Sequence, residues 1–164
     1  MTEDQLVIST NSVESLIKAV RRHGLAWEET GALLLTTPEK WDVVAVALAG
    51  DDGIQRGKGL FVITLPAFDA LFTYAEEQDL QVRAMVHSHP YEAFLSPVDR
   101  QHGLRVRGFI SAVIPTYGDP PVDPSDWGWW RFEDDWHPTQ PAIMVEHGPV
   151  AKVFTFDSGG LHDD

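Results

Sequence analysis

The residues best suited to chemistry lie in one short stretch of the sequence. Residues 87–90 read His-Ser-His-Pro, and residues 96–99 read Ser-Pro-Val-Asp. On a strand, side chains two apart point to the same face, so His87 and His89 would present two imidazoles side by side. Asp99 can supply a carboxylate from the following helix. Two histidines and one carboxylate leave the fourth position of a tetrahedral zinc open for water, which is typical of catalytic rather than structural sites.

A hydrolytic zinc site also needs a base that is not itself a ligand. Glu28 and Glu29 both precede the apolar strand that begins at Gly31, and on spacing alone either can serve. Ser96 can donate a hydrogen bond to the oxyanion of a tetrahedral intermediate. The other interpretation of Ser96 is purely structural, because a serine followed three residues later by an acidic residue is a common helix start.

The periodicity of the chain predicts the elements that must position these groups. Apolar spacing predicts helices at 11–24, from Pro66 onward and at 96–104, and strands at 31–36, 41–49, 60–64, 82–89, 108–114 and 129–132. The segments 142–146 and 150–156 are predicted to form a closing hairpin around Gly148-Pro149. Strands that alternate with helices and hairpins predict an α/β (α+β) fold class.

Composition narrows the function classes. The chain has 164 residues, no cysteine and a formal net charge of −13. Without cysteine there is no disulfide, thiol nucleophile or cysteine-ligated metal, which also excludes a zinc deaminase of the usual kind. The acidity speaks against nucleic acid as a partner. It favours either simple solubility or a basic partner protein. With no apolar run of membrane length and an acidic, polar start, no membrane association and a cytoplasmic location are expected.

The order of these motifs resembles the JAMM signature of MPN-domain zinc metallopeptidases, which is a glutamate, then His-x-His-Pro, then Ser-x-x-Asp. The resemblance covers roughly residues 12–115 and places the glutamate three residues before Gly31, which selects Glu28 as the catalytic acid–base beside Ser96. It implies one Zn²⁺ held by His87, His89 and Asp99. Nine residues separate His89 from Asp99, one fewer than is usual in the family, so the loop between them must be tighter.

The resemblance also implies a fold, an activity and partners. The fold would be the MPN/JAMM fold, a curved mixed β-sheet flanked by helices, cytidine-deaminase-like, with residues 1–156 as a single catalytic domain and 157–164 as a disordered tail. The activity would be isopeptidase or peptidase cleavage after the C-terminus of a ubiquitin-like protein, as in prokaryotic deubiquitinase-like members. Partners would be the ubiquitin-like C-terminal tail and the ubiquitin-like activating or conjugating enzymes of bacterial or antiphage systems.

Substrate contacts are expected at Gly57 and Gly59, because segment 50–59 matches the position of a loop of the family that can pair with the substrate's extended tail. Tyr91 and Phe94 are expected to line the same tail-binding groove. Two alternatives remain at this point. One is a non-catalytic MPN scaffold that binds a partner protein, and the other is release of a sulfur-carrier protein from its adduct. The tryptophan-rich segment 127–136 fits core packing or an interface.

Overall fold

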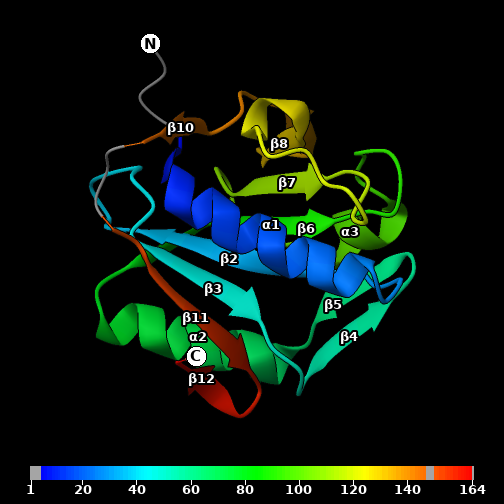
Figure 1. The fold of residues 1–164 in the computed structure, drawn as a ribbon. Coiled ribbons are helices and arrows are strands. Elements are labelled where there is room, and N and C mark those ends of the chain that lie inside the picture. The colour runs from blue at the N-terminus through cyan, green and yellow to red at the C-terminus, as the bar shows by residue number, and fades with distance from the viewer. Residues whose placement is uncertain (1–4, 147–149, 164) are drawn as a thin grey trace.

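The protein is built around an eight-stranded mixed sheet with helices on both faces (Figure 1). The computed structural model describes residues 5–146 and 150–163. The strand order is β12-β11-β3-β2-β6-β7-β8-β9, and two further pairs, β1-β10 and β4-β5, lie outside this sheet. The helices are α1 (Thr10–Gly24), α2 (Leu65–Glu77), α3 (Pro97–His102) and the 3₁₀ turn η1 (Pro124–Asp126). The strands are β1 (Val7–Ser9), β2 (Gly31–Thr36), β3 (Ala45–Ala49), β4 (Ile54–Gly57), β5 (Leu60–Ile63), β6 (Gln81–Ser88), β7 (Ile110–Ile114), β8 (Gly128–Phe132), β9 (Trp136–Pro138), β10 (Ile143–Val145), β11 (Lys152–Asp157) and β12 (Gly160–His162).

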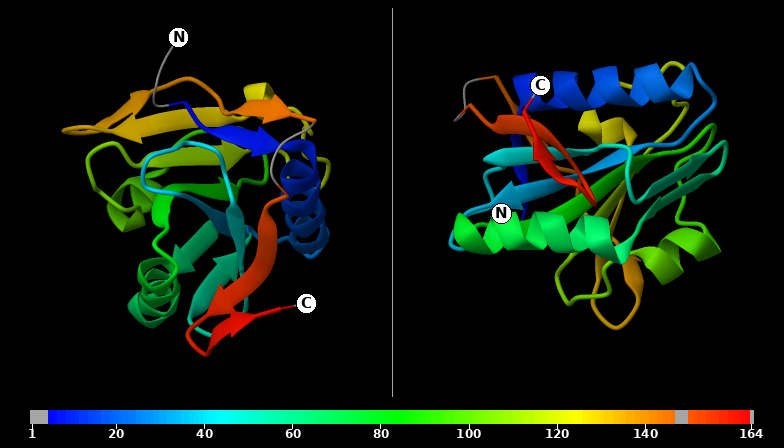
Figure 2. Two further views of the ribbon diagram at one scale, coloured as in Figure 1. Left: turned by 90° about the vertical axis from the view of Figure 1, so that its left-hand side faces the viewer. Right: turned by 90° about the horizontal axis from the view of Figure 1, so that it is seen from below.

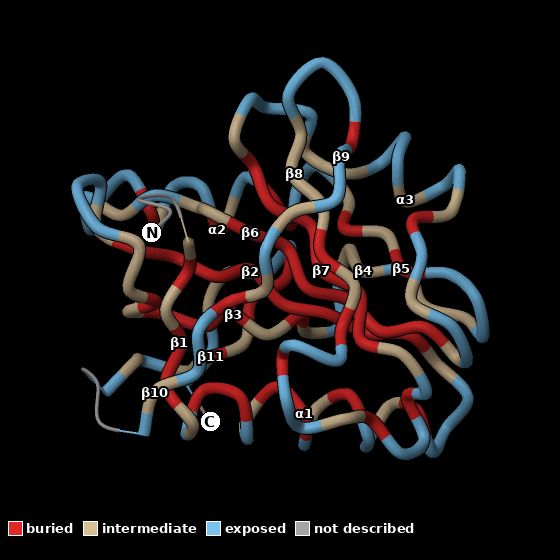
Figure 3. Tube along the Cα trace, turned by 90° about the horizontal axis from the view of Figure 1, so that it is seen from above, coloured by how far each residue is buried: buried red, intermediate tan, exposed pale blue. Residues whose placement is uncertain are grey.

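Strand β2 lies near the middle of the sheet and is buried along its whole length, as its apolar sequence predicts (Figure 3). Its side chains alternate between two cores. Ala32 and Leu34 pack on the side of α1, whereas Leu33 and Leu35 pack on the side of α2. The sheet therefore separates α1 from α2, as the right-hand view of Figure 2 shows. This alternation decides which residues near β2 can reach the candidate site.

Helix α1 is capped two residues earlier than expected, because Ser9 rather than Asn11 is its N-cap and accepts a hydrogen bond from the Ser12 amide. Its apolar positions fall at helical spacing and enter the core, as predicted. The helix ends at Gly24, where an added Cβ atom would lie 2.2 Å from the Tyr117 carbonyl oxygen. Only glycine permits this close approach, which fixes the turn that leads into β2.

Two expectations for the C-terminal part are wrong. The segments 142–146 and 150–156 do not pair with each other, since β10 pairs in parallel with β1 and β11 pairs in parallel with β3. The turn proposed at 148–149 lies outside the described residues. The tail from residue 157, which was expected to be disordered, instead contains β12. This strand pairs antiparallel with β11 and places His162 opposite Thr155.

The mixed α+β architecture is confirmed, and most elements lie within a few residues of their predicted bounds. The segment 50–59, expected as a loop, contributes β4 to a hairpin with β5. The buried positions of Trp127, Trp129 and Trp136 assign those three side chains to the core. No helix in the described part of the chain is long and apolar enough to cross a membrane.

Candidate metal centre

The two predicted histidines meet at the end of β6. His87 lies in the strand and His89 directly follows it, and their Nε2 atoms are 3.2 Å apart. Both side chains are buried. The His89 backbone is held at both ends, because its amide donates to the Ile114 carbonyl and its carbonyl accepts from the Tyr117 amide. Strand geometry therefore delivers two imidazoles to one point, as the His-x-His spacing predicts.

The carboxylate of Asp99 completes the cluster from α3. Its Oδ2 atom lies 3.1 Å from His87 Nε2 and 3.0 Å from His89 Nε2. Ser96 and Asp99 form a full capping box, in which the Ser96 hydroxyl accepts from the Asp99 amide and Asp99 Oδ2 accepts from the Ser96 amide. Burial alone would raise the pKa of the Asp99 carboxyl, but hydrogen bonds from the two imidazoles and the Ser96 amide hold it well below its usual range.

Counting protons shows that hydrogen bonds alone cannot satisfy all three contacts of this triangle. Each Nε2 atom carries at most one proton, so at most two protons serve three mutual contacts. His89 Nδ1 lies 3.2 Å from the Glu92 carbonyl, which can only accept. This contact therefore fixes a proton on Nδ1 and, in a neutral ring, leaves Nε2 with its lone pair toward Asp99.

The same triangle fits a tetrahedral metal ion. Zinc bonds of about 2.0–2.2 Å to nitrogen and oxygen imply ligand atoms about 3.3 Å apart in tetrahedral geometry. The three observed separations are 3.0, 3.1 and 3.2 Å. A buried His87 Nδ1 has no hydrogen-bond partner within the described residues, so this ring is oriented by packing, with Phe61 stacked 6.2 Å away.

Glu29, and not Glu28, accompanies these groups. Glu29 Oε2 lies 4.0 Å from His89 Nε2, and Glu29, His87 and His89 form a buried group that can bind a metal ion. Its side chain is 3% exposed, against 40% for Glu28. Burial, followed by the charge of Asp99, raises the pKa of Glu29 to about 8.

The choice of Glu28 as the acid–base group is therefore corrected. Glu28 points to the other face of the sheet and pairs with Nδ1 of His23 on α1 at 3.3 Å. The physical reason is side-chain alternation, which continues beyond the start of β2. The Thr30 carbonyl accepts from the Ser88 amide and hydroxyl, and the Thr30 amide donates to the Ser88 hydroxyl. The chain is therefore still extended there, and Glu29 shares the face of Gly31.

The remaining predicted residues lie around the centre with different degrees of contact. Phe94 packs edge-on against the His89 ring at 4.8 Å, and the Gly57 carbonyl accepts the Glu29 amide at 2.9 Å. Tyr91 is 61% exposed. Gly59 lies at the tip of the β4–β5 hairpin, and an added Cβ atom there would meet nothing within 4 Å. The structure thus brings the hairpin and the 91–96 loop to the same end of the molecule as α3 (Figures 1 and 2).

Arg56 is a structural residue of this region that the sequence did not reveal. Its guanidinium donates to the Thr30 hydroxyl and to the carbonyls of Ala49 and Gly50, at 2.6–3.2 Å. These bonds tie β4 to the end of β3 and to the residue that follows Glu29. An arginine in a glycine-rich segment carries no pattern that predicts such contacts.

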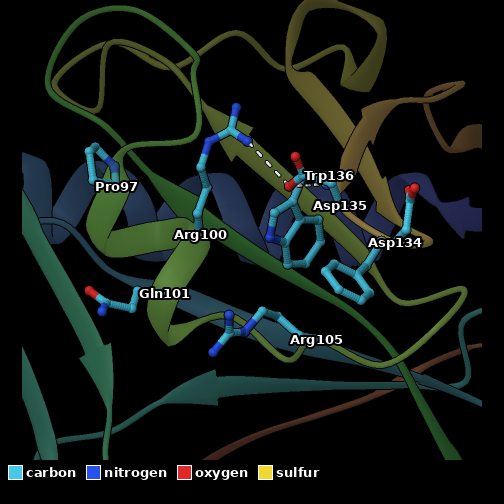
Figure 4. Close-up of a pocket in the computed structure, with 8 residues that line it drawn as sticks. Pro97, Arg100, Gln101, Arg105, Asp134, Asp135 and Trp136 are labelled. Atoms are coloured by element: carbon cyan, nitrogen blue, oxygen red, sulfur yellow. Dashed lines mark hydrogen bonds and ion pairs between the residues drawn. The ribbon is translucent and has the colours of Figure 1, made fainter.

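A hollow of about 450 Å³ lies on the outer side of α3 (Figure 4). Its wall includes Arg100, Gln101 and Trp136, and none of the three triangle residues lines it. Pro97, Arg100 and Gln101 share one face of α3, whereas Asp99 points to the imidazoles. The hollow is therefore separate from the candidate metal centre.

Comparison with known proteins supports the fold. No family model matches the chain. Among solved structures, a JAB1/MPN domain protein from Archaeoglobus fulgidus aligns with a TM-score of 0.51 and 17% identity over 86% of this chain and 100% of that one. A protein of Desulfitobacterium hafniense aligns with a TM-score of 0.63 and 13% identity over 87% and 94%, and one of Salinibacter ruber with 0.57 and 19% over 89% and 96%. At these identities the likeness concerns the fold alone, which is MPN-like.

Proposed function

We propose that this protein is a zinc-dependent hydrolase of peptide or isopeptide bonds. The observation that carries the proposal is the triangle of His87, His89 and Asp99 with Glu29 beside it. The three ligand atoms have tetrahedral-metal spacing. Glu29 Oε2 lies 4.0 Å from His89 Nε2, wider than the ligand–ligand spacing of a tetrahedral site but near enough to exchange protons through a bound water.

Each residue then has a separate role. His87, His89 and Asp99 would hold zinc, which when bound lowers the pKa of water and polarises a carbonyl. Glu29 takes the proton from the attacking water and passes it to the leaving amine, a task suited to a carboxyl whose pKa is raised to about 8. The Ser96 hydroxyl uses its lone pair as an acceptor for the Asp99 amide, which leaves its proton available for an oxyanion.

The substrate proposed for this centre is the C-terminal tail of a ubiquitin-like protein, deconjugated or processed at its last residue. Support comes from the resemblance of the motif and from the position of the β4–β5 hairpin, whose Gly57 is bonded to Glu29. A hairpin next to the centre can align an extended chain by strand addition, and glycines let another backbone approach closely. Activating and conjugating enzymes would act beside it.

The test compares two neighbouring glutamates that differ in placement. Zinc content is measured first, and hydrolysis is then followed with a pool of fluorogenic hexapeptides and with ubiquitin linked to a fluorescent lysine peptide. Glu29→Gln is expected to bind zinc but to lower the rate about 10²–10⁴-fold, as for a lost acid–base group. Glu28→Gln is the matched control and should keep the parent rate. A protein that binds zinc yet cleaves neither probe is not this hydrolase, and one that binds no metal is better explained as an MPN scaffold.

A further inference from the structure

Two exposed aromatic rings flank a lysine at the rim of the candidate centre. Trp27 and Tyr91 are 62% and 61% exposed. The Nζ atom of Lys58 lies 5.6 Å from the Trp27 ring centroid and 6.0 Å from the Tyr91 ring centroid. Both distances fall within the range at which an aromatic face attracts a cation. The three residues come from three separate segments, the α1–β2 turn, the hairpin tip and the loop after β6.

Trp27 has an unusual backbone. Its φ is +61°, in the left-handed region that bulky residues rarely adopt. The turn is held by hydrogen bonds from the Trp27 amide to the Gly24 carbonyl and from the Glu28 amide to the His23 carbonyl. A glycine or asparagine would occupy this position more easily, and burial does not explain a side chain so exposed. Strain of this kind gathers at functional sites.

The backbone of Lys58 is held by hydrogen bonds that do not involve its ammonium group. Its carbonyl accepts a hydrogen bond from the Tyr117 hydroxyl at 3.3 Å, and the preceding carbonyl, of Gly57, accepts from the Glu29 amide. The Lys58 residue itself is exposed. Its ammonium group can therefore leave the two rings without disturbing the hairpin.

The charge of the region favours a cation as the ligand that binds between these rings. The chain carries a net charge of −13, and Glu28, whose side chain is 40% exposed, directly follows Trp27. We propose that Trp27 and Tyr91 form a clamp that binds an arginine or lysine side chain of the peptide substrate. In the free protein the Lys58 ammonium group occupies this position. That this side chain belongs to a substrate rests on the proposed function, whereas binding of the cation does not.

The test measures binding without cleavage, so its failure is distinct from failure of the hydrolase proposal. Three probes are used. They are N-acetyl-argininamide, its neutral isostere N-acetyl-citrullinamide and the acidic N-acetyl-glutamate α-amide. Each is titrated into the ¹⁵N-labelled full chain, and the amide signals of Gly59 and Tyr91 report binding. The arginine probe is expected to bind at least about fivefold more tightly than citrulline, from two cation–π contacts.

Two variants separate the clamp from a binding role of Lys58. Trp27→Gly suits the left-handed backbone and is expected to weaken arginine binding at least about threefold. Lys58→Met removes the competitor and is expected to tighten it about twofold or more. Lys152→Met is the matched control, because Lys152 lies 5.8 Å from the rings of Tyr74 and Phe154 on a different surface. Equal binding of arginine and citrulline, or weaker arginine binding in Lys58→Met, would overturn the proposal. Preference for the glutamate probe would also overturn it, since Lys58 would then be an anion site.

Discussion

The raised pKa of Glu29 makes a direct prediction about stability in the metal-free protein. The folded state keeps the Glu29 proton up to about pH 8, whereas the unfolded chain releases it near 4.5. The unfolded state thus binds fewer protons between these values, and the free energy of unfolding falls as pH rises through this window. Glu29→Gln removes the titrating proton but keeps the size of the side chain, so the variant should lack this loss.

The magnitude follows from the size of the shift. One pKa unit corresponds to about 1.4 kcal/mol. A rise from 4.5 to about 8 therefore sets an upper limit of about 5 kcal/mol on the difference between variant and parent at pH 8. Rotation of an ionised Glu29 toward solvent relieves part of this cost. We expect Glu29→Gln to gain about 2–5 kcal/mol relative to the parent between pH 4.5 and pH 8.

The assay is urea unfolding of chelator-treated protein at several pH values from 4.5 to 8, with the variant-minus-parent difference plotted against pH. Glu28→Gln provides the control, because it removes one negative charge from the same chain at a side chain that is 40% exposed and paired with His23. Such a pair contributes less than about 1 kcal/mol. Parallel curves for Glu29→Gln and the parent would refute the placement of Glu29 in a buried site beside Asp99.

Two further substitutions test how the centre is held. Ser96→Ala removes the hydroxyl that accepts the Asp99 amide; unfolding free energy should fall by about 1 kcal/mol and zinc affinity about tenfold, measured by denaturation and by competition with a chromophoric chelator. Gly31→Ala places a Cβ atom 2.4 Å from the Val86 carbonyl oxygen and 3.1 Å from His87 Cβ. It should cost about 1–3 kcal/mol and weaken zinc binding, whereas Gly118→Ala, in open space, should change stability by less than about 0.5 kcal/mol. Unchanged zinc affinity in Ser96→Ala or Gly31→Ala would contradict these roles.

The triangle was predictable from the sequence because each part depends on local rules. His87 and His89 share a face through strand periodicity, and Asp99 is fixed by a capping box that the Ser-Pro-x-Asp pattern announces. Only the contact between the end of β6 and the start of α3 depends on tertiary structure. Because residues 90–96 form a short connection, the start of α3 must lie close to the end of β6. The shorter spacing between His89 and Asp99 is accommodated, since Asp99 still reaches both imidazoles.

Long-range pairing was not predictable in the same way. Segments 143–145 and 152–157 have strand-like sequences on either side of a Gly-Pro pair, which favours a hairpin on local grounds. Their partners, β1 and β3, lie more than a hundred residues earlier in the chain, and no local sequence pattern predicts these pairings. Both pairings are parallel. The pairing of β11 with β3 buries Phe154 and Phe156, whereas Ile143 and Met144 of β10 stay exposed.

The choice of Glu28 instead of Glu29 was wrong for a different reason, and the sequence alone was sufficient to correct it. Counting back from Gly31 measured distance along the chain, whereas access to the imidazoles depends on the face of the sheet. His87 lies opposite Gly31 in the β2–β6 ladder, so the face of Gly31 is the face of the site. Residues that share this face on an extended chain have odd numbers, which selects Glu29 and sends Glu28 toward α1 and His23. Strand parity thus places Glu29 beside the imidazoles where a motif count does not, because the bonds of Thr30 to Ser88 keep the chain extended through Thr30.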